Sequence, residues 1–129
     1  MIEKGIKGRE EVLVTEENCA LTVGSGTLKV FATPAMSALM EKTAWKSVAP
    51  FLEEGQSTVG TMLNLTHISA TPIGMKVVCE SELVAVEGRK LVFKLSVSDE
   101  AGLIGECEHE RFIVYDERFQ SKAQSKLKK

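Results

Sequence analysis

The fold of this chain is decided by Thr33-Pro-Ala-Met-Ser-Ala-Leu-Met-Glu-Lys-Thr-Ala-Trp-Lys-Ser-Val-Ala49, the longest helical pattern in the body of its sequence. Apolar and small residues recur here at three- and four-residue spacing, which places them on one face of a helix. They are Met36, Leu39, Met40, Thr43, Ala44, Ser47 and Val48. Thr33 is of a type preferred at N-caps, Pro34 suits the first turn, and Pro50 stops a regular helix. The pattern predicts a helix from Pro34 to Ala49, about 24 Å long.

Strand patterns lie on both sides of this helix. Glu10–Val14 precedes it, and four segments with strand character follow Gly55, separated by short turns. These segments are Thr58–Ser69, Lys76–Val86, Lys90–Ser98 and Ile104–Tyr115. In the third, the apolar residues Leu91, Phe93, Leu95 and Val97 alternate with the polar residues Lys94, Ser96 and Ser98. We expect the four segments to form an antiparallel meander in chain order.

One strand, one helix and a run of antiparallel strands are typical of an α+β architecture. We predict the hotdog fold, in which a curved antiparallel sheet of about five strands wraps one long helix, as a single domain over residues 1–117. An unpaired sheet edge is usually covered by a partner, so we expect a homodimer. Residues 118–129 form a basic tail, and the four-residue spacing of Arg118, Lys122 and Lys126 predicts a short amphipathic helix there.

The composition is that of a soluble globular protein, with 129 residues of which 43% are hydrophobic and 26% charged. The net charge is −2, but residues 118–129 hold five of the sixteen cations and none of the eighteen acids. The rest of the chain is therefore acidic, which argues against a nucleic-acid partner. No apolar run has the length of a membrane span or a signal peptide, so we also expect no membrane partner.

The cysteines and histidines exclude several kinds of site. The three cysteines, Cys19, Cys79 and Cys107, are odd in number and far apart, which indicates neither a disulfide framework nor a redox or metal motif. Reduced cysteines are typical of a reducing compartment, so we expect a cytoplasmic protein. The two histidines, His67 and His109, lack neighbouring metal-ligand spacing. We expect no metal and no cofactor.

Three residues have the side chains that acyl transfer most often needs: the hydroxyl of Thr33, the carboxylate of Glu41 and the imidazole of His67. Thr33 and Glu41 are eight residues apart, about two helical turns, so both can lie on one side of the helix. Each residue also has a structural interpretation. Thr33 can cap the helix, Glu41 can be a solvated carboxylate, and His67 can be a hydrogen-bonded strand residue. His109 and Arg111 share a face of the last strand, either as a surface or interface pair or as an anion contact through the guanidinium of the arginine.

These residues lie in an ordered series of blocks that resembles the fluoroacetyl-CoA thioesterase type of hotdog proteins, over about residues 10–125. The blocks are Val30-Phe-Ala-Thr-Pro-Ala-Met36, Ala38-Leu-Met-Glu41, Gly55-Gln-Ser-Thr-Val-Gly-Thr61, Thr66-His67, Ala70-Thr-Pro-Ile-Gly-Met75, Val86-Glu-Gly-Arg-Lys-Leu91, Ile104-Gly105 and His109-Glu-Arg111. The resemblance implies a catalytic set of Thr33, Glu41 and His67. It also implies substrate contacts by Gly60 and Arg111, and sites that lie between the subunits of a dimer.

The expected function is hydrolysis of an acyl-CoA to the free acid and CoA. His67 would act as general base and acid, and Thr33 or Glu41 would attack the thioester or orient the attacking water. The fluoroacetyl-specific enzyme resembled here has a longer lid containing Phe and Pro, whereas Asn18–Lys29 is shorter and no Phe precedes Phe31. We therefore expect another acyl group. Two alternatives stay open: a hotdog hydratase or dehydratase of enoyl thioesters, and a non-catalytic acyl-CoA binding protein.

Overall fold

The computed structural model describes residues 2–128, and its main elements follow the predicted order of one strand, one long helix and four strands. The strands are β1 (Lys7–Leu13), β2 (Gln56–His67), β3 (Lys76–Glu87), β4 (Lys90–Asp99) and β5 (Gly102–Tyr115). The helices are α1 (Ala20–Val23), α2 (Thr33–Val48) and α3 (Asp116–Gln124), with single 3-10 turns at Glu16–Asn18, Ala49–Phe51 and Ser125–Leu127. No helix within residues 2–128 is both long and apolar enough to cross a membrane.

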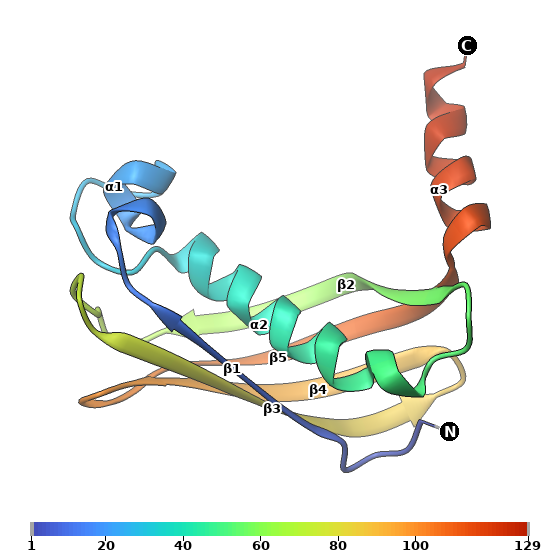
Figure 1. The fold of residues 1–129 in the computed structure, drawn as a ribbon, viewed down its shortest axis with the longest axis horizontal. Coiled ribbons are helices and arrows are strands. Elements are labelled where there is room, and N and C mark those ends of the chain that lie inside the picture. The colour runs from blue at the N-terminus through green and yellow to red at the C-terminus, as the bar shows by residue number, and fades with distance from the viewer. Residues whose placement is uncertain (1, 129) are drawn as a thin grey trace.

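The five strands form one antiparallel sheet in the order β1-β3-β4-β5-β2, and α2 lies across one of its faces (Figure 1). This arrangement confirms the predicted α+β hotdog fold. At one end of the molecule α1 lies near the start of α2, and at the other end α3 projects away from the sheet (Figure 1). The sheet therefore has two edge strands, β1 and β2, and β2 is the longer of them.

The predicted meander is wrong in one respect, because β2 pairs with β5 and not with β3. Residues 68–75 carry the chain from the β2 edge to β3, past β5 and β4. Three strand spacings amount to about 14 Å, which eight residues can easily span. Backbone hydrogen bonds hold this crossing segment in place, among them the bond from Phe31 N to Thr71 O at 2.8 Å. β2 is therefore the edge strand of the sheet on the side of β5.

The apolar face of α2 packs on the sheet as its spacing predicts. The buried residues of this face are Met36, Leu39, Met40, Thr43, Ala44 and Val48, while Ser47 is half-buried. They meet the inward-facing residues of the central strands, which include Val77, Cys79, Leu83, Leu91, Phe93, Leu95 and Val97. Apolar contact along the whole helix fixes the position of α2 relative to the sheet. Because the helix backbone is rigid, this packing also fixes the backbone positions of the helix residues that do not face the core.

The start of α2 differs from the prediction. Ala32 is the N-cap residue, and no side chain caps the helix. Thr33 is the first helical residue instead, and its hydroxyl lies beside the ring of His67. A tertiary contact has taken the hydroxyl that local preference assigned to the cap. This contact is the starting point for the site described below.

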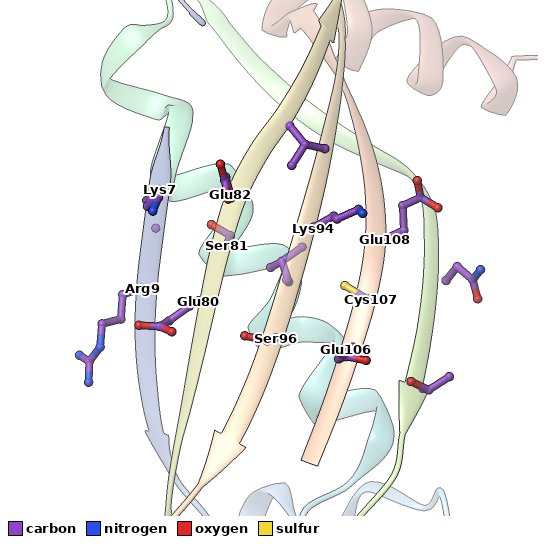
Figure 2. Close-up of a pocket in the computed structure, with 15 residues that line it drawn as sticks. Lys7, Arg9, Glu80, Ser81, Glu82, Lys94, Ser96, Glu106, Cys107 and Glu108 are labelled. Atoms are coloured by element: carbon purple, nitrogen blue, oxygen red, sulfur yellow. The ribbon is translucent and has the colours of Figure 1, made fainter. Parts of the chain in front are cut away.

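The face of the sheet that points away from α2 carries charged side chains in rows, which Figure 2 shows. In one row the neighbours across successive strands are Lys7, Glu82, Lys94 and Glu108, so the sign of the charge alternates. A hollow of about 960 Å³ extends over this face. It is the larger of the two hollows described here, yet it contains none of the predicted site residues, because those lie on the helix side or at the sheet edge. We interpret this surface as a solvated sheet face.

A second row on the same face offers a stability test. Here Ser96 lies between Glu80 on β3 and Glu106 on β5, where the first row has a lysine. We expect Ser96→Lys to stabilise the fold by about 0.5–1 kcal/mol, because opposite charges on neighbouring strands attract. Urea unfolding measures the change. Lys94→Ser is the matched control and should destabilise by a similar amount. A destabilised Ser96→Lys protein would contradict the described register.

Candidate active site

The first part of the candidate site is a hydroxyl–imidazole pair. Thr33 stands in the first turn of α2 and His67 is the last residue of β2, and their Oγ1 and Nδ1 atoms lie 2.7 Å apart. The pair opens on a pocket of about 290 Å³. The pocket is lined by Ala20, Ser25, Val30, Phe31, Thr33, His67, Ile68, Ser69 and Ala70. An accessible hydroxyl within hydrogen-bond reach of an imidazole is the arrangement of a nucleophile with its base, or of two groups that hold a water.

His67 lies in surroundings that favour its neutral form. Burial lowers the pKa of its imidazole, and the nearby backbone of Ser69 offsets part of this effect. A neutral ring has one nitrogen free to accept a proton, as a general base must. Within residues 2–128 its second nitrogen, Nε2, is buried and has no hydrogen-bond partner. A buried unpaired polar atom is unfavourable for stability, so it calls for an explanation, and a catalytic role is one such explanation.

The lowered pKa of His67 predicts the pH dependence of catalysis. We expect kcat/KM to rise with pH and to reach half its plateau below about pH 6.5, the pKa of an unperturbed histidine. The free energy of unfolding should change in the same sense. Because the unfolded chain binds this proton more tightly than the folded one, stability is complete above the unfolded pKa and is lost as pH falls below it. A pH–rate profile with a midpoint clearly above 6.5 would contradict this assignment of the base.

The second part of the site gathers around Gly60. A Cβ atom at Gly60 would lie 2.8 Å from Glu41 Oε2, 3.2 Å from His109 Cε1 and 3.3 Å from Arg111 Nη1. These three side chains therefore converge on the glycine from α2 and β5. The pairing of β2 with β5 is irregular at this point, with Thr61 as an extra residue between Gly60 and Met62. A glycine at such an irregularity allows close approach to the backbone. Any side chain at Gly60 would displace the Glu41 carboxylate.

Arg111 is held by a dense set of hydrogen bonds. Its Nε donates to Thr58 Oγ1 at 2.8 Å, its Nη2 donates to the Thr58 carbonyl at 2.9 Å, and its Nη1 donates to His109 Nε2 at 3.1 Å. Only 6% of the residue is exposed. Burial lowers the pKa of the guanidinium and the Glu41 carboxylate opposes that shift, yet an arginine remains charged at neutral pH. The cluster thus presents a fixed positive charge beside Gly60.

The structure brings the five predicted site residues together in two groups. Thr33 and His67 form one group, and Glu41, Gly60 and Arg111 form the other. Thr33 and Glu41 are two turns apart on α2, which separates them by about 12 Å. One chain therefore does not place the Glu41 carboxylate beside the hydroxyl–imidazole pair.

Two members of the second group were not predicted as site residues. Thr58 binds the guanidinium of Arg111 through two of its oxygens, and His109 binds it through Nε2. The spacing of His109 and Arg111, two apart on one strand face, was the only signal in the sequence. Among residues 2–128, no three side chains of the metal-binding types lie close enough together to hold an ion.

Solved structures of thioesterases have the same fold as this chain. A crystal structure of the fluoroacetyl-CoA thioesterase FlK superposes with a TM-score of 0.92 at 32% identity, covering 98% of each chain. A thioesterase superfamily member from Thermus thermophilus superposes with a TM-score of 0.88 at 27% identity, covering 96% of this chain and 92% of its own. The molecule is therefore a hotdog protein of the thioesterase type.

The family follows from the sequence. The family model described as fluoroacetyl-CoA-specific thioesterase matches residues 14–117. The fluoroacetyl-CoA thioesterase of Streptantibioticus cattleyicolor is 41% identical over 98 residues, which are 76% of this chain and 70% of that protein. The chain belongs to the fluoroacetyl-CoA-specific thioesterase family, as its sequence blocks predicted.

Proposed function

We propose that this protein hydrolyses a short acyl-CoA to the free acid and CoA. The observation that carries the proposal is the 2.7 Å contact of Thr33 Oγ1 with His67 Nδ1 at the edge of a pocket, in a chain of a thioesterase family. A related crystal structure, of a threonine-to-serine variant of the fluoroacetyl-CoA enzyme, contains acetyl-CoA. Its similarity to this chain, with a TM-score of 0.92, supports a CoA thioester as the substrate class here.

The chemistry assigns each group a step. His67 takes the proton of the attacking hydroxyl, which belongs either to Thr33 or to a water oriented by the Glu41 carboxylate. The oxygen bonds to the thioester carbonyl carbon, the C–S bond breaks, and the leaving thiolate receives the proton from His67. If Thr33 attacks, water then hydrolyses the resulting ester by the same two proton transfers. The backbone N–H of Gly60 and the guanidinium of Arg111 are the groups we assign to the developing oxyanion.

The separation of the two groups in one chain supports a homodimer. β2 is a twelve-residue edge strand, and such edges are usually paired or covered. If two copies join their β2 strands antiparallel about a two-fold axis, the His67 end of one strand runs beside the other end of its neighbour. The Thr33–His67 pair of one subunit then approaches the Gly60 group of its partner. We propose that each site takes Thr33 and His67 from one subunit and Glu41 from the other.

The acyl group that can bind is limited by the size of the pocket and by the chain segment that forms part of its wall. The segment Asn18–Lys29 contains α1 and contributes Ala20 and Ser25 to the pocket wall. The pocket is small and lined mainly by aliphatic side chains, by Phe31 and by short polar residues. We propose an acyl group of short chain other than fluoroacetyl. We also propose a cytoplasmic location, because Cys19, Cys79 and Cys107 are all buried free thiols.

A thiol-release screen tests the proposed function. Purified protein is given acetyl-, branched, aromatic, long-chain and fluoroacetyl-CoA, and free CoA is measured with a thiol reagent. We expect the highest kcat/KM with a short unsubstituted or branched acyl chain. Enoyl absorbance is followed in parallel with crotonyl-CoA. Loss of that absorbance without thiol release would replace the thioesterase with a hydratase, and tight binding without either signal would indicate a binding protein.

Helix α3 provides a separate prediction about CoA binding. Its residues are exposed, and Arg118, Lys122 and Lys126 form no ion pair within residues 2–128. CoA carries several phosphate charges, so we expect Arg118→Ala combined with Lys122→Ala to raise KM about threefold or more with little change in kcat. Gln120→Ala combined with Gln124→Ala is the control on the same helix. An unchanged KM would mean that the basic residues are only solvated.

A further inference from the structure

His109 is completely buried, and both of its ring nitrogens are used. Nδ1 lies 2.8 Å from the carbonyl oxygen of Met62, and Nε2 lies 3.1 Å from Nη1 of Arg111. A carbonyl only accepts and a guanidinium only donates, so Nδ1 must carry the proton and Nε2 must be the acceptor. The hydrogen bonds therefore specify a neutral imidazole in one tautomer.

The two bonds of His109 reach different parts of the site. Met62 directly follows Thr61, the extra residue of the β-bulge in β2. The bond from His109 to the Met62 carbonyl therefore holds the bulge beside Gly60 in place. The bond to Nη1 of Arg111 complements the two bonds that Thr58 accepts from the same guanidinium. Phe93 lies against the ring with a centroid distance of 6.1 Å, which limits its movement. The imidazole thus joins the Gly60 backbone to the Arg111 guanidinium.

Arg111 has two N–H groups that bind no residue within the described part of the chain. A guanidinium has five N–H groups, and three of them are bonded to Thr58 and His109 within the described residues. One N–H on each Nη is left, and Nη1 lies beside Gly60. With Nε, Nη1 and Nη2 all anchored, the guanidinium plane cannot rotate, and the two remaining N–H groups have fixed directions. An oriented donor stabilises a developing charge far better than a mobile one.

We propose that His109 is a positioning residue, which locks the Arg111 guanidinium and the bulge beside Gly60 into one rigid unit that receives the thioester carbonyl. The proposal rests on the proposed function, since it assigns His109 to that same site. His109 is not itself a catalytic residue, because its ring is completely buried and both of its nitrogens already bond to Met62 and Arg111.

A double-mutant cycle with Arg111 tests this role. His109→Phe keeps the ring volume and removes both hydrogen bonds. We expect it to lower kcat/KM about 10- to 100-fold, through both a lower kcat and weaker binding of the thioester carbonyl, as a misplaced positioning group does. In the Arg111→Met background the same change should cost less than about threefold, because its target is already gone. Equal losses in both backgrounds would overturn the proposal.

Two further variants separate positioning from stability. His109→Gln offers an amide donor and acceptor in place of the ring nitrogens. We expect it to retain a higher kcat than His109→Phe even if the two variants have the same melting temperature. Equal loss in both variants would count against the proposal. Leu83→Val, in the core of β3, should lower the melting temperature and leave kcat unchanged. If its kcat falls like that of His109→Phe, the effect of His109 is structural.

The same cycle is run on the binding of a thioether analogue of acetyl-CoA, measured by calorimetry. Coupling between His109 and Arg111 in affinity supports the proposal even if the wild-type protein releases no thiol, an outcome that would defeat the proposed function alone. Additive effects on affinity, together with additive effects on kcat/KM, would defeat the inference while leaving thioesterase activity intact.

Discussion

Replacing His67 with alanine should lower kcat for acyl-CoA hydrolysis about 10²–10⁴-fold, the span expected for a positioned acid–base group. The reason is the 2.7 Å contact of Nδ1 with the Thr33 hydroxyl, which no other side chain of the chain replaces within residues 2–128. We expect little change in stability, because the ring is only partly buried and its Nε2 has no partner there. Stopped-flow or steady-state thiol release measures kcat.

Thr66→Ala is the control for this prediction. Thr66 is the preceding residue of β2, and it lines the hollow on the opposite face of the sheet. Its replacement should leave kcat within about twofold of wild type, as expected for an exposed position outside the site. Undiminished turnover by His67→Ala would eliminate His67 as the proton-handling residue.

Glu41→Gln should lower kcat by about 10² or more while the affinity for a thioether analogue of acetyl-CoA stays nearly unchanged. The substitution keeps the shape of the side chain and removes the charge that faces Arg111 and Gly60. A carboxylate that orients the attacking water is needed in the transition state more than in the bound complex, so kcat should fall while affinity for the analogue should not.

Glu80→Gln provides the matched control, because this carboxylate lies on the solvated face of the sheet. It should leave both kcat and affinity at the wild-type level. If Glu41→Gln weakens binding of the analogue as strongly as it lowers kcat, Glu41 serves to hold the ligand, and the catalytic role of its carboxylate is wrong.

Features that depend on local periodicity were predictable from the sequence. The buried face of α2 was predicted almost residue by residue. Apolar side chains that recur every 3.6 residues can all be buried together only on one face of a helix. The alternation of Leu91, Phe93, Leu95 and Val97 gave the inward face of β4 for the same reason. Both patterns depend on neighbours in the chain and not on distant partners.

Features that depend on long-range pairing were not predictable. The place of β2 beside β5 involves residues about fifty positions apart, and no local pattern distinguishes it from pairing with β3. The role of Thr33 as a helix cap was wrong, because His67 competes for the same hydroxyl. The contact of Thr33 with His67, and the absence of such a contact with Glu41, likewise depend on where the end of β2 lies beside α2.

We propose that one active site takes Thr33 and His67 from one subunit and Glu41 from its partner. The most direct test of this proposal mixes two inactive proteins, His67→Ala and Glu41→Gln, after subunit exchange or by co-expression with different tags. A mixed dimer then contains one site with both changes and one site with neither. We expect the mixture to recover roughly a quarter of the wild-type kcat per subunit, since half of the dimers are mixed and each has one intact site. Activity that stays at the level of the separate variants, in a mixture shown to contain mixed dimers, would mean that no active site combines His67 of one subunit with Glu41 of the other.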